Sequence, residues 1–250
     1  MKIIRRLKTS IYRSYYKHLS RTKWKIVRFL GAEFVMAPSN YIDRRMCVEG
    51  GYEKAQLAFL LKRFEDQPFD AFIDIGANFG LYSCVAGCSK KIPVVHSFEC
   101  DPRNILHFKG HIRMNELSEI VNLHPFAVGD CNTEITFNMT ADGATGHSHV
   151  DENIEGYEKI HSEQHTTIQV RQKPIDDVLL LENKKLAIKI DVEGYEQIVL
   201  KGMGKLLDNN KCLIQIEAFD TDKGIESYLG PLGYKYIHRI DDDWYFSNMD

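Results

Sequence analysis

The chain has 250 residues, 44% of them hydrophobic, which is enough to bury the core of one α/β domain. Its net charge of −3 at pH 7 favours no particular class of partner. No run of about 18 apolar residues is present, so the sequence predicts no membrane-spanning helix. Six cysteines without a C-x-x-C pair, together with a start that lacks a secretory signal, predict reduced thiols in a cytoplasmic protein.

Basic residues are concentrated at the N-terminus. Residues 1–32 hold ten of the 32 Lys and Arg residues and none of the 35 acidic ones, so the rest of the chain is acidic. Apolar residues in this segment recur at helical spacing: Ile4, Leu7, Ile11 and Tyr15. A basic amphipathic helix is typical of membrane-surface segments, so one expectation is that residues 1–30 contact a membrane or an anionic glycolipid. The other is that they pack on the acidic body or on a second subunit of a homo-oligomer, and nothing else in the chain favours nucleic acid.

Two segments lie between this arm and the first buried strand. Residues 33–52 are rich in Pro, Ser, Asn and Gly, which predicts a loop or short strands. Residues 52–64 carry apolar side chains at helical spacing and predict a helix that covers the sheet. We therefore expect a basic N-terminal helical arm with a cap segment at 1–50 and a single larger domain at 51–250.

Residues 71–87 combine a short apolar run, a glycine turn and a second apolar run. The first run leads into Asp74 and predicts a buried parallel strand, and the second predicts the helix that follows it. Gly76 allows a tight turn and the close approach of a ligand, while Gly80 lies where the helix begins and its N–H groups are free. Such a strand–turn–helix unit holds nucleotide-like ligands in doubly wound sheets.

The residues of this turn indicate which ligand it holds. The dinucleotide motif G-x-G-x-x-G is absent, because position 78 is Asn. The carboxylate of Asp74 would repel a pyrophosphate, but it suits a ligand with an ammonium and a sulfonium, as in S-adenosylmethionine. An ordinary glycine turn of an α/β domain is the alternative.

A second acid follows at the end of the next strand. Val94–Glu99 is another short apolar run, and its acid comes 25 residues after Asp74. A carboxylate at this place hydrogen-bonds the ribose of a bound nucleotide, and one carboxylate can accept from both hydroxyls. The turn that follows contains Pro102 at a favourable position for a helix start, and residues 101–115 have a helical pattern.

The rest of the chain alternates between strand and helix patterns. We predict strands at 121–128, 134–139, 167–171, 186–191 and 212–217, a short helix at 175–181, a helix from 193 to 200, and a closing hairpin at 234–237 and 243–247. Residues 140–164 lack apolar periodicity, which favours a binding loop or lid. Asp191 and Glu217 end their strands, where open sheets place their ligands.

Three blocks of this sequence resemble a known family. The blocks are Phe72–Ser83, Ser97–Asn104 and Ile188–Glu196, and they are similar, in order and spacing, to the signature blocks of the FkbM-type methyltransferases. The resemblance runs from about residue 70 to about residue 220, and Lys-Ile-Asp-Val-Glu-Gly in the third block is its most specific part. One departure is Cys100, because the family usually has proline after the acid of the second block.

The resemblance implies a fold and a cofactor. The fold is α/β: a Rossmann-like class I methyltransferase fold with a mostly parallel seven-stranded sheet and helices on both faces, here with an N-terminal helical arm. The cofactor is S-adenosyl-L-methionine. We expect it to contact Asp74, Gly76, Asn78, Phe79, Gly80, Glu99, Asn104, Ala127, Asp130 and Asp191. The resemblance alone assigns Ala127 and Asp130, which it places beside the adenine.

Methyl transfer to a hydroxyl also needs a group that accepts the hydroxyl proton. Our candidates are His147, Glu193 and Glu217, with His149 of the same loop as a further one. His147 comes first because imidazole titrates near neutral pH and the loop at 140–164 should cover the cofactor, whereas Glu193 has helix capping as an alternative role. We expect no metal. The acids Asp191, Glu217 and Asp220 could converge, but acids at strand ends are equally expected around a cationic cofactor.

The sequence therefore predicts an S-adenosylmethionine-dependent O-methyltransferase. The resemblance implies a hydroxylated glycan or small-molecule acceptor. The basic arm favours a sugar hydroxyl in a surface polysaccharide or glycolipid, handled in the cytoplasm or peripherally at the inner face of the membrane. A polyketide-type acceptor and a non-catalytic cofactor-binding module remain alternatives. A nicotinamide-dependent oxidoreductase is disfavoured by Asn78, which stands where that class needs glycine.

Overall fold

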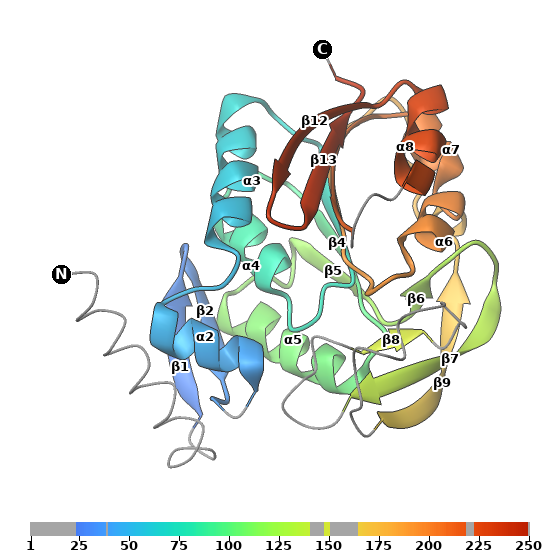
Figure 1. The fold of residues 1–250 in the computed structure, drawn as a ribbon. Coiled ribbons are helices and arrows are strands. Elements are labelled where there is room, and N and C mark those ends of the chain that lie inside the picture. The colour runs from blue at the N-terminus through green and yellow to red at the C-terminus, as the bar shows by residue number, and fades with distance from the viewer. Residues whose placement is uncertain (1–23, 39, 141–147, 151–164, 219–222, 250) are drawn as a thin grey trace.

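A computed structural model describes residues 24–38, 40–140, 148–150, 165–218 and 223–249. Its centre is a seven-stranded sheet with the strand order β12-β13-β11-β10-β3-β4-β5 (Figure 1). In that order the strands are Lys235–Ile240, Asp243–Ser247, Lys211–Glu217, Lys185–Ile190, Ala71–Ile75, Val95–Phe98 and Val121–His124. Strands β11, β10, β3, β4 and β5 are parallel, and β13 runs antiparallel to both of its neighbours. The expected mostly parallel sheet is confirmed.

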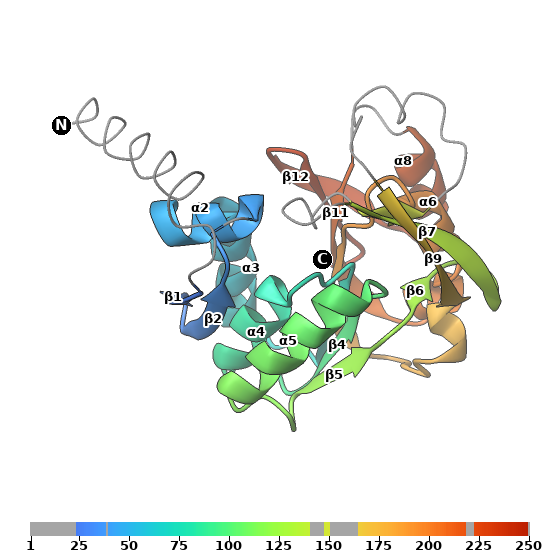
Figure 2. The same cartoon turned by 90° about the horizontal axis from the view of Figure 1, so that it is seen from below.

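Helices cover both faces of this sheet (Figure 2). On one face lie α3 (Lys54–Asp66), α4 (Leu81–Cys88) and α5 (Pro102–Met114), and on the other lie α6 (Glu196–Lys201), α7 (Gly204–Asp208) and α8 (Lys223–Leu229). Alternate residues of one strand enter the two resulting cores. Phe72 packs with α3 to α5, while Ile73 and Ile75 pack with α6 to α8. Strands buried on both faces explain the continuous apolar runs in the sequence.

A smaller four-stranded sheet lies beside the α6 to α8 face, with the order β6-β9-β7-β8 (Figure 1). Its strands are Ala127–Val128, His165–Lys173, Thr133–Thr140 and His149–Val150. Two of them, β7 and β9, are the strands predicted at 134–139 and 167–171, each somewhat longer. Most of the predicted binding loop at 140–164 lies outside the described residues; its described part contributes β8 and Ser148.

The predicted helix at 175–181 is wrong. Only a single 3-10 turn, η3 (Ile175–Asp177), forms there. Its Asp176 carboxylate accepts from the N–H groups of Lys205 and Leu206, which holds the turn against the start of α7. Leu180, which would complete an apolar helix face, is 89% exposed. A second 3-10 turn, η4 (Gly230–Leu232), connects α8 to the closing hairpin.

The N-terminal part of the described chain is a β-hairpin followed by a helix. Strands β1 (Lys25–Phe29) and β2 (Ala32–Met36) pair antiparallel, and α2 (Tyr41–Glu49) begins after Asn40, whose side chain accepts from the N–H of Ile42. Within the described residues, the part of the expected arm at 25–36 is therefore a β-hairpin and not a helix. The reason is the period-two burial of Val27, Phe29 and their partners on β2, which a helix could not bury together.

Residues 1–23, with the apolar helical spacing noted above, lie outside the described residues. The boundary at residue 50 stays a prediction, although Phe34 and Met36 of the hairpin share one apolar core with Leu57 and Phe72. None of the helices that the structure describes is both long and apolar enough to cross a membrane. All six cysteines fall within the described parts of the chain, and no disulfide joins any of them.

Candidate active site

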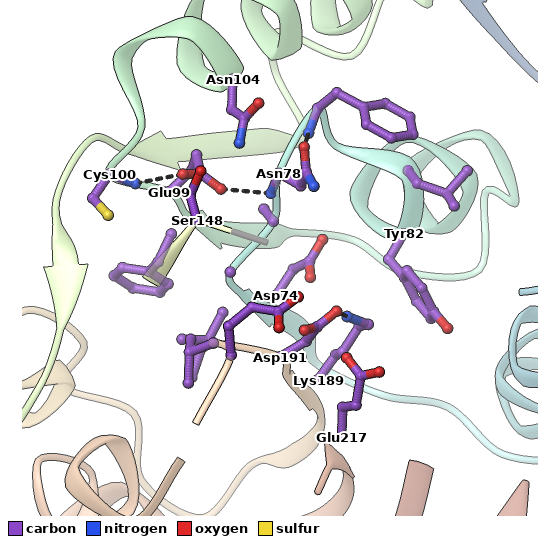
Figure 3. Close-up of a pocket in the computed structure, with 18 of the residues that line it drawn as sticks. Asp74, Asn78, Tyr82, Glu99, Cys100, Asn104, Ser148, Lys189, Asp191 and Glu217 are labelled. Carbon is purple, nitrogen blue, oxygen red and sulfur yellow. Dashed lines mark hydrogen bonds and ion pairs between the residues drawn. The ribbon is translucent and has the colours of Figure 1, made fainter. Parts of the chain in front are cut away.

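A cavity of about 350 Å³ opens at the carboxyl ends of the parallel strands (Figure 3). The turns after β3 and β4, the ends of β10 and β11, and the start of α2 form its walls. This is the place where an open α/β sheet holds its ligand. Predicted site residues that line it are Asp74, Gly76, Asn78, Phe79, Glu99, Asn104, Ala127, Asp191, Glu193 and Glu217.

Two predicted cofactor contacts do not line the cavity. Asp130 follows β6 and is exposed to solvent, so the expectation that it approaches the adenine is not supported. Gly80 is required for packing: its φ is +86°, and a Cβ there would lie 2.1 Å from the ring of Phe108. His147 lies outside the described residues, but the neighbouring Ser148 lines the cavity.

The glycine turn between β3 and α4 packs closely against the backbone that follows β10. Gly76 has a φ of +77°, and a Cβ on it would lie 1.8 Å from the carbonyl oxygen of Asp191. Asn78 also has a positive φ, of 51°, and its side-chain oxygen accepts from the N–H of Phe79 at 2.8 Å. Asn tolerates this conformation better than most residues, which explains why the turn needs no third glycine.

Glu99 is held by the backbone around it. Its Oε1 accepts from the N–H groups of Cys100 and Asp101 at 2.9 and 2.7 Å, and its Oε2 accepts from Asn78 N–H at 2.7 Å. Burial raises the pKa of this carboxyl to about 7, against the opposite effect of these bonds. Since each carboxylate oxygen has two lone pairs, Oε2 can take one further donor. The carboxylate can therefore accept from one ribose hydroxyl, whereas the sequence led us to expect hydrogen bonds from both hydroxyls.

Asp74 faces the cavity from the end of β3. Its Oδ2 accepts from the N–H and the hydroxyl of Ser83, at 3.1 and 2.5 Å. Its Oδ1 is buried and has no hydrogen-bond partner within the described parts of the chain. Burial raises the pKa of this carboxyl, and the nearby charge of Lys189 acts against that shift. An orphan carboxylate oxygen at the wall of a cavity fits the ammonium group of a bound amino-acid moiety.

A row of buried polar side chains crosses the sheet behind the cavity. The members lie opposite one another in register on five neighbouring strands: Ser97, Asp74, Lys189, Gln215 and Tyr245. Their side chains share one face of the sheet, and Ser83 of α4 connects two of them, with 2.7 Å between its hydroxyl and that of Ser97. The row anchors the carboxyl end of the sheet to α4, so the position of Asp74 depends on it.

Lys189 supplies the positive charge of this row. Its ammonium donates to Asp191 Oδ2 at 2.6 Å and lies 4.6 Å from the ring centre of Tyr82. Gln215 donates to the hydroxyl of Tyr82 at 3.1 Å and to Asp243 Oδ1 at 2.8 Å. Periodicity in the sequence gives no signal for Ser83, Ser97 or Gln215 as members of this row. A polar residue inside an apolar run changes no periodicity, so only the strand register reveals these partners.

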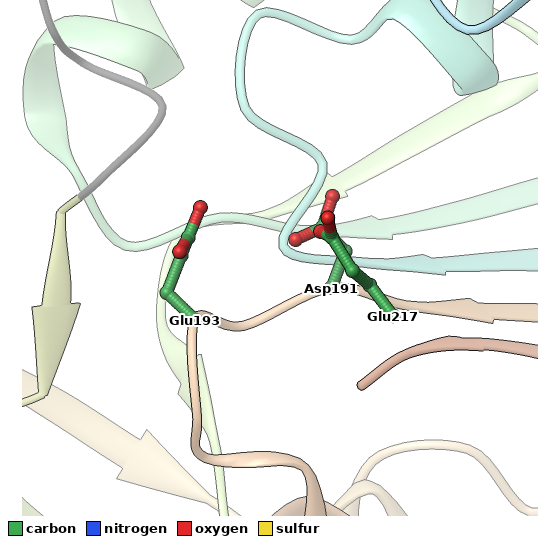
Figure 4. A group of neighbouring side chains, drawn as sticks. All are labelled: Asp191, Glu193 and Glu217. Atoms are coloured by element: carbon green, nitrogen blue, oxygen red, sulfur yellow. The ribbon is translucent and has the colours of Figure 1, made fainter. Parts of the chain in front are cut away.

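Three carboxylates converge at the carboxyl ends of β10 and β11 (Figure 4). One oxygen from each of Asp191, Glu193 and Glu217 lies within 4.8 Å of the others. The charge of Asp191, and then burial, raise the pKa of Glu217 well above its ordinary range, and the two groups hydrogen-bond each other. Two carboxylates in hydrogen-bond contact resist ionising together, so this arrangement favours one proton held between them.

Glu193 does not start the following helix, which corrects one expectation. It has a φ of +53° in the bend before α6. Glu196, the first residue of α6, accepts through its Oε1 from the N–H groups of Val192 and Gly194, which holds this bend. Glu193 lines the cavity from the same bend. The three carboxylates also have the spacing of a metal site, and the prediction that none binds stays a prediction.

The chain was compared with protein families, curated proteins and solved structures. The family model for the methyltransferase FkbM domain matches residues 74–236. No curated protein matches. The FkbM methyltransferase structure from Methylobacillus flagellatus KT is 17% identical at a TM-score of 0.49, covering 72% of this chain and 43% of its own.

Two further solved structures are similar. The human methyltransferase 10 domain containing protein is 11% identical at a TM-score of 0.50, and the match covers 96% of this chain and 95% of that one. The structure of M. jannaschii TYW2 in complex with AdoMet is 12% identical at a TM-score of 0.43, and the match covers 90% of this chain and 83% of that one. The human structure supports the class I methyltransferase fold. Because the family model spans well over half of the sequence, the chain belongs to the FkbM methyltransferase family.

Proposed function

We propose that this chain is an S-adenosylmethionine-dependent O-methyltransferase that acts on a hydroxyl of a sugar in a surface polysaccharide or glycolipid. The observation that carries the proposal is the cavity itself. Glu99 and Asp74, two acids with different hydrogen-bond partners, line the cavity at the glycine turn, and a cluster of three carboxylates lines it beside them. Membership of the FkbM family supports the methyltransferase class.

The cofactor would lie along the glycine turn. When bound, it supplies a methyl group on a cationic sulfur, and the sulfur is the leaving group when a nucleophile attacks that methyl carbon in line. Glu99 would accept from a ribose hydroxyl, and Asp74 would accept from the ammonium through its orphan oxygen. Phe98, Phe126 and Val128 form an apolar wall beside these acids, which suits an adenine ring.

The carboxylate cluster would receive the proton of the acceptor hydroxyl. Asp191 is bound to Lys189, and its charge raises the pKa of Glu217. Glu193, which lines the cavity beside them, is the carboxylate that we propose takes the proton as the new carbon–oxygen bond forms. His147 stays a second candidate for this role, on the sequence argument alone.

A second cavity supports a polyhydroxylated acceptor. It measures about 520 Å³ and shares Tyr52, Glu53 and Glu217 with the first cavity. The rest of its wall is mostly charged or polar and includes Arg45, Glu49, Lys54, Gln56, Asp241, Asp242 and Asp243. Hydrogen-bonding walls suit a sugar better than the largely apolar skeleton of a polyketide, which remains the alternative acceptor.

Binding of the cofactor is tested by calorimetric titration of the full chain with S-adenosylhomocysteine, with NAD(H) as the control ligand. We expect micromolar binding of the first and none of the second. Glu99→Gln should weaken binding about tenfold to a hundredfold, because an amide cannot accept all the bonds of this carboxylate. The matched control is Glu119→Gln, at an exposed acid away from the cavity. Equal affinity in both variants would show that the site is assigned wrongly.

Methyl transfer is tested separately. Labelled S-adenosylmethionine is incubated with neutral polysaccharide, with glycolipid and with hydroxylated polyketides, and label is located in the products. We expect label on a sugar oxygen. Label confined to the polyketides would favour the alternative acceptor. Cofactor binding without turnover on any hydroxylated acceptor would support a non-catalytic cofactor-binding module instead.

A further inference from the structure

Glu53 is an acid of the candidate active site that has no role in the cofactor contacts or the proton transfer proposed above. It immediately precedes α3, and it lines both the first cavity, proposed for the cofactor, and the second, more polar cavity. Among the described residues, the wall that belongs to both cavities consists of Tyr52, Glu53 and Glu217. A molecule that enters from the second cavity therefore passes Glu53 before it reaches a methyl group on the bound cofactor.

The backbone at Glu53 is held in an uncommon conformation. Its φ of +46° lies in the left-handed region, which residues other than glycine rarely adopt. Two residues earlier, Gly51 has a φ of +143°, and a Cβ there would collide with the ring of Phe29. Glu53 also occupies the N-cap position of α3, but its side chain makes no capping hydrogen bond. The carboxylate does not stabilise the start of the helix, so its strained position points to a task in the cavity.

The carboxyl group of Glu53 retains capacity to accept hydrogen bonds. Burial raises its pKa to about 7, and the charge of Lys189 and a hydrogen bond with the hydroxyl of Tyr82 act against that shift. Tyr82 accepts from the side-chain amide of Gln215 at 3.1 Å, so its own proton is available to Glu53. Within the described parts of the chain, no ion pair or backbone N–H engages this carboxyl. Since a carboxylate offers about four lone pairs, most of its accepting capacity is left for a ligand.

The neighbours of Glu53 lie on the side of the first cavity that the adenosine would not fill. Figure 3 shows Tyr82, Lys189 and Glu217 on one side of the cavity and Glu99 on the opposite side. Because Glu99 fits a ribose hydroxyl, the adenosine would lie on its side. The side beside Glu53, which opens to the second cavity, is therefore the side from which an acceptor approaches.

We propose that Glu53 selects the acceptor: its carboxylate accepts a hydrogen bond from a second hydroxyl of the sugar that is being methylated. The inference rests on the proposed function and names the kind of sugar that the site takes. A hydroxyl is the suitable donor, because Lys189 already supplies a positive charge beside this carboxylate. An acidic or phosphorylated sugar is disfavoured, because the described wall of the second cavity carries six acids and two bases. The acceptor is thus a neutral sugar with at least two free hydroxyls.

The test uses the full chain, labelled S-adenosylmethionine and the methyl glycosides of glucose, mannose, galactose, rhamnose and fucose. We expect the wild type to methylate at least one of these neutral sugars. In Glu53→Gln the KM for that glycoside should rise about tenfold, because an amide replaces a charged acceptor, while kcat changes less. Affinity for S-adenosylhomocysteine should stay at the wild-type value. Glu65→Gln, at an exposed acid of α3 that lines neither cavity, is the matched control and should behave like the wild type.

Singly deoxygenated forms of the same glycoside identify the hydroxyl that Glu53 contacts. In the wild type, loss of that hydroxyl should raise KM about tenfold, whereas in Glu53→Gln it should cause no further rise, because its partner is already removed. A variant that merely disturbs the fold would weaken binding of every form alike. Glu53→Gly removes the carboxylate and suits the positive φ, so it should fold and show the same loss of discrimination. Circular dichroism checks the fold of each variant.

The inference is overturned if the wild type binds S-adenosylhomocysteine but methylates none of these glycosides, or if both Glu53 variants keep the wild-type KM. It is also overturned if the Glu53 variants lose affinity for S-adenosylhomocysteine, since the carboxylate would then hold the cofactor. Equal effects of every deoxygenation in the wild type and in the variants would overturn it as well. A wild type that binds no S-adenosylhomocysteine, or that labels polyketides alone, would instead contradict the proposed function.

Discussion

The carboxylates of this site have different roles because their surroundings differ. The backbone holds Glu99 with three N–H groups, whereas one oxygen of Asp74 has no hydrogen-bond partner among the described residues. The charge of Asp191 raises the pKa of the neighbouring Glu217. Hydrogen bonds to the ionised form, burial, and a neighbouring like charge are the three separate causes. Lys189 is the cation that makes this density of buried acids tolerable.

Lys189→Met should therefore destabilise the protein severely. The variant leaves Asp74 and Asp191 close together without the ammonium between them, and breaking a buried ion pair in this way costs about 3–5 kcal/mol. Urea unfolding measures the free energy of unfolding directly. Lys185→Met, at the exposed start of the same strand, is the control and should change stability by less than about 0.5 kcal/mol. Similar stability of both variants would mean that Lys189 does not hold the acids in place.

Single elements of the fold are joined by one buried imidazole. His111 of α5 accepts from the N–H of Val35 through Nε2 and donates to the carbonyl oxygen of Phe79 through Nδ1, so it bridges β2 and the glycine turn. These bonds require the neutral ring with its proton on Nδ1. Burial lowers the pKa of His111 to about 4. Protonation would break the bond from Val35 and charge a buried group.

This linkage predicts that stability depends on pH. Because the folded-state pKa of His111 lies below its unfolded value of about 6.5, the stabilisation is complete above pH 6.5 and is lost as the pH falls toward about 4. The free energy of unfolding at pH 5 should be about 2 kcal/mol lower than at pH 7.5 from this group. In His111→Gln the dependence should be flatter. A residual slope is expected from His124, whose pKa burial also lowers to about 4, and an unchanged slope would exclude His111 as the cause.

The molecule as a whole has two apolar cores, one on each face of the central sheet. The N-terminal hairpin belongs to one of them: Phe34 and Met36 are fully buried there, beside the helices that support the cavity. The hairpin is therefore a structural part of the domain. The segment before it, residues 1–23, is distinguished in the sequence by its charge, with eight Lys and Arg residues and no acid.

Truncation should separate these two parts. Removal of residues 1–23 should leave the thermal unfolding midpoint and the affinity for S-adenosylhomocysteine close to those of the full chain. Removal of residues 1–36 deletes Phe29, Phe34 and Met36 from the core, at several kcal/mol for each large side chain, so the protein should unfold at far lower temperature or not fold. Circular dichroism on heating measures both. A shortened chain without the hairpin that melts like the full chain would contradict this account.

Much of the fold follows from local patterns in the sequence. The strands of the central sheet are short apolar runs, and Asp74, Glu99 and Asp191 close three of them, so their meeting at one edge of a parallel sheet is expected. Strand β1 (Lys25–Phe29) was not predicted, because its basic residues read as a continuation of the arm, whereas most of β2 lies within 33–52, where a loop or short strands were expected. Its alternating burial is visible only beside the helices that cover it.

The sequence by itself determined the class of fold, the glycine turn and the acids that face the cavity, because apolar periodicity and turn residues are local properties. The tertiary structure decided the strand register that places Ser97, Asp74, Lys189 and Gln215 in one row. It also decided that His111 joins two distant elements and that Asp130 does not line the cavity. These facts depend on which side chains meet across the fold, and contacts between residues far apart in the chain leave no periodic trace in it.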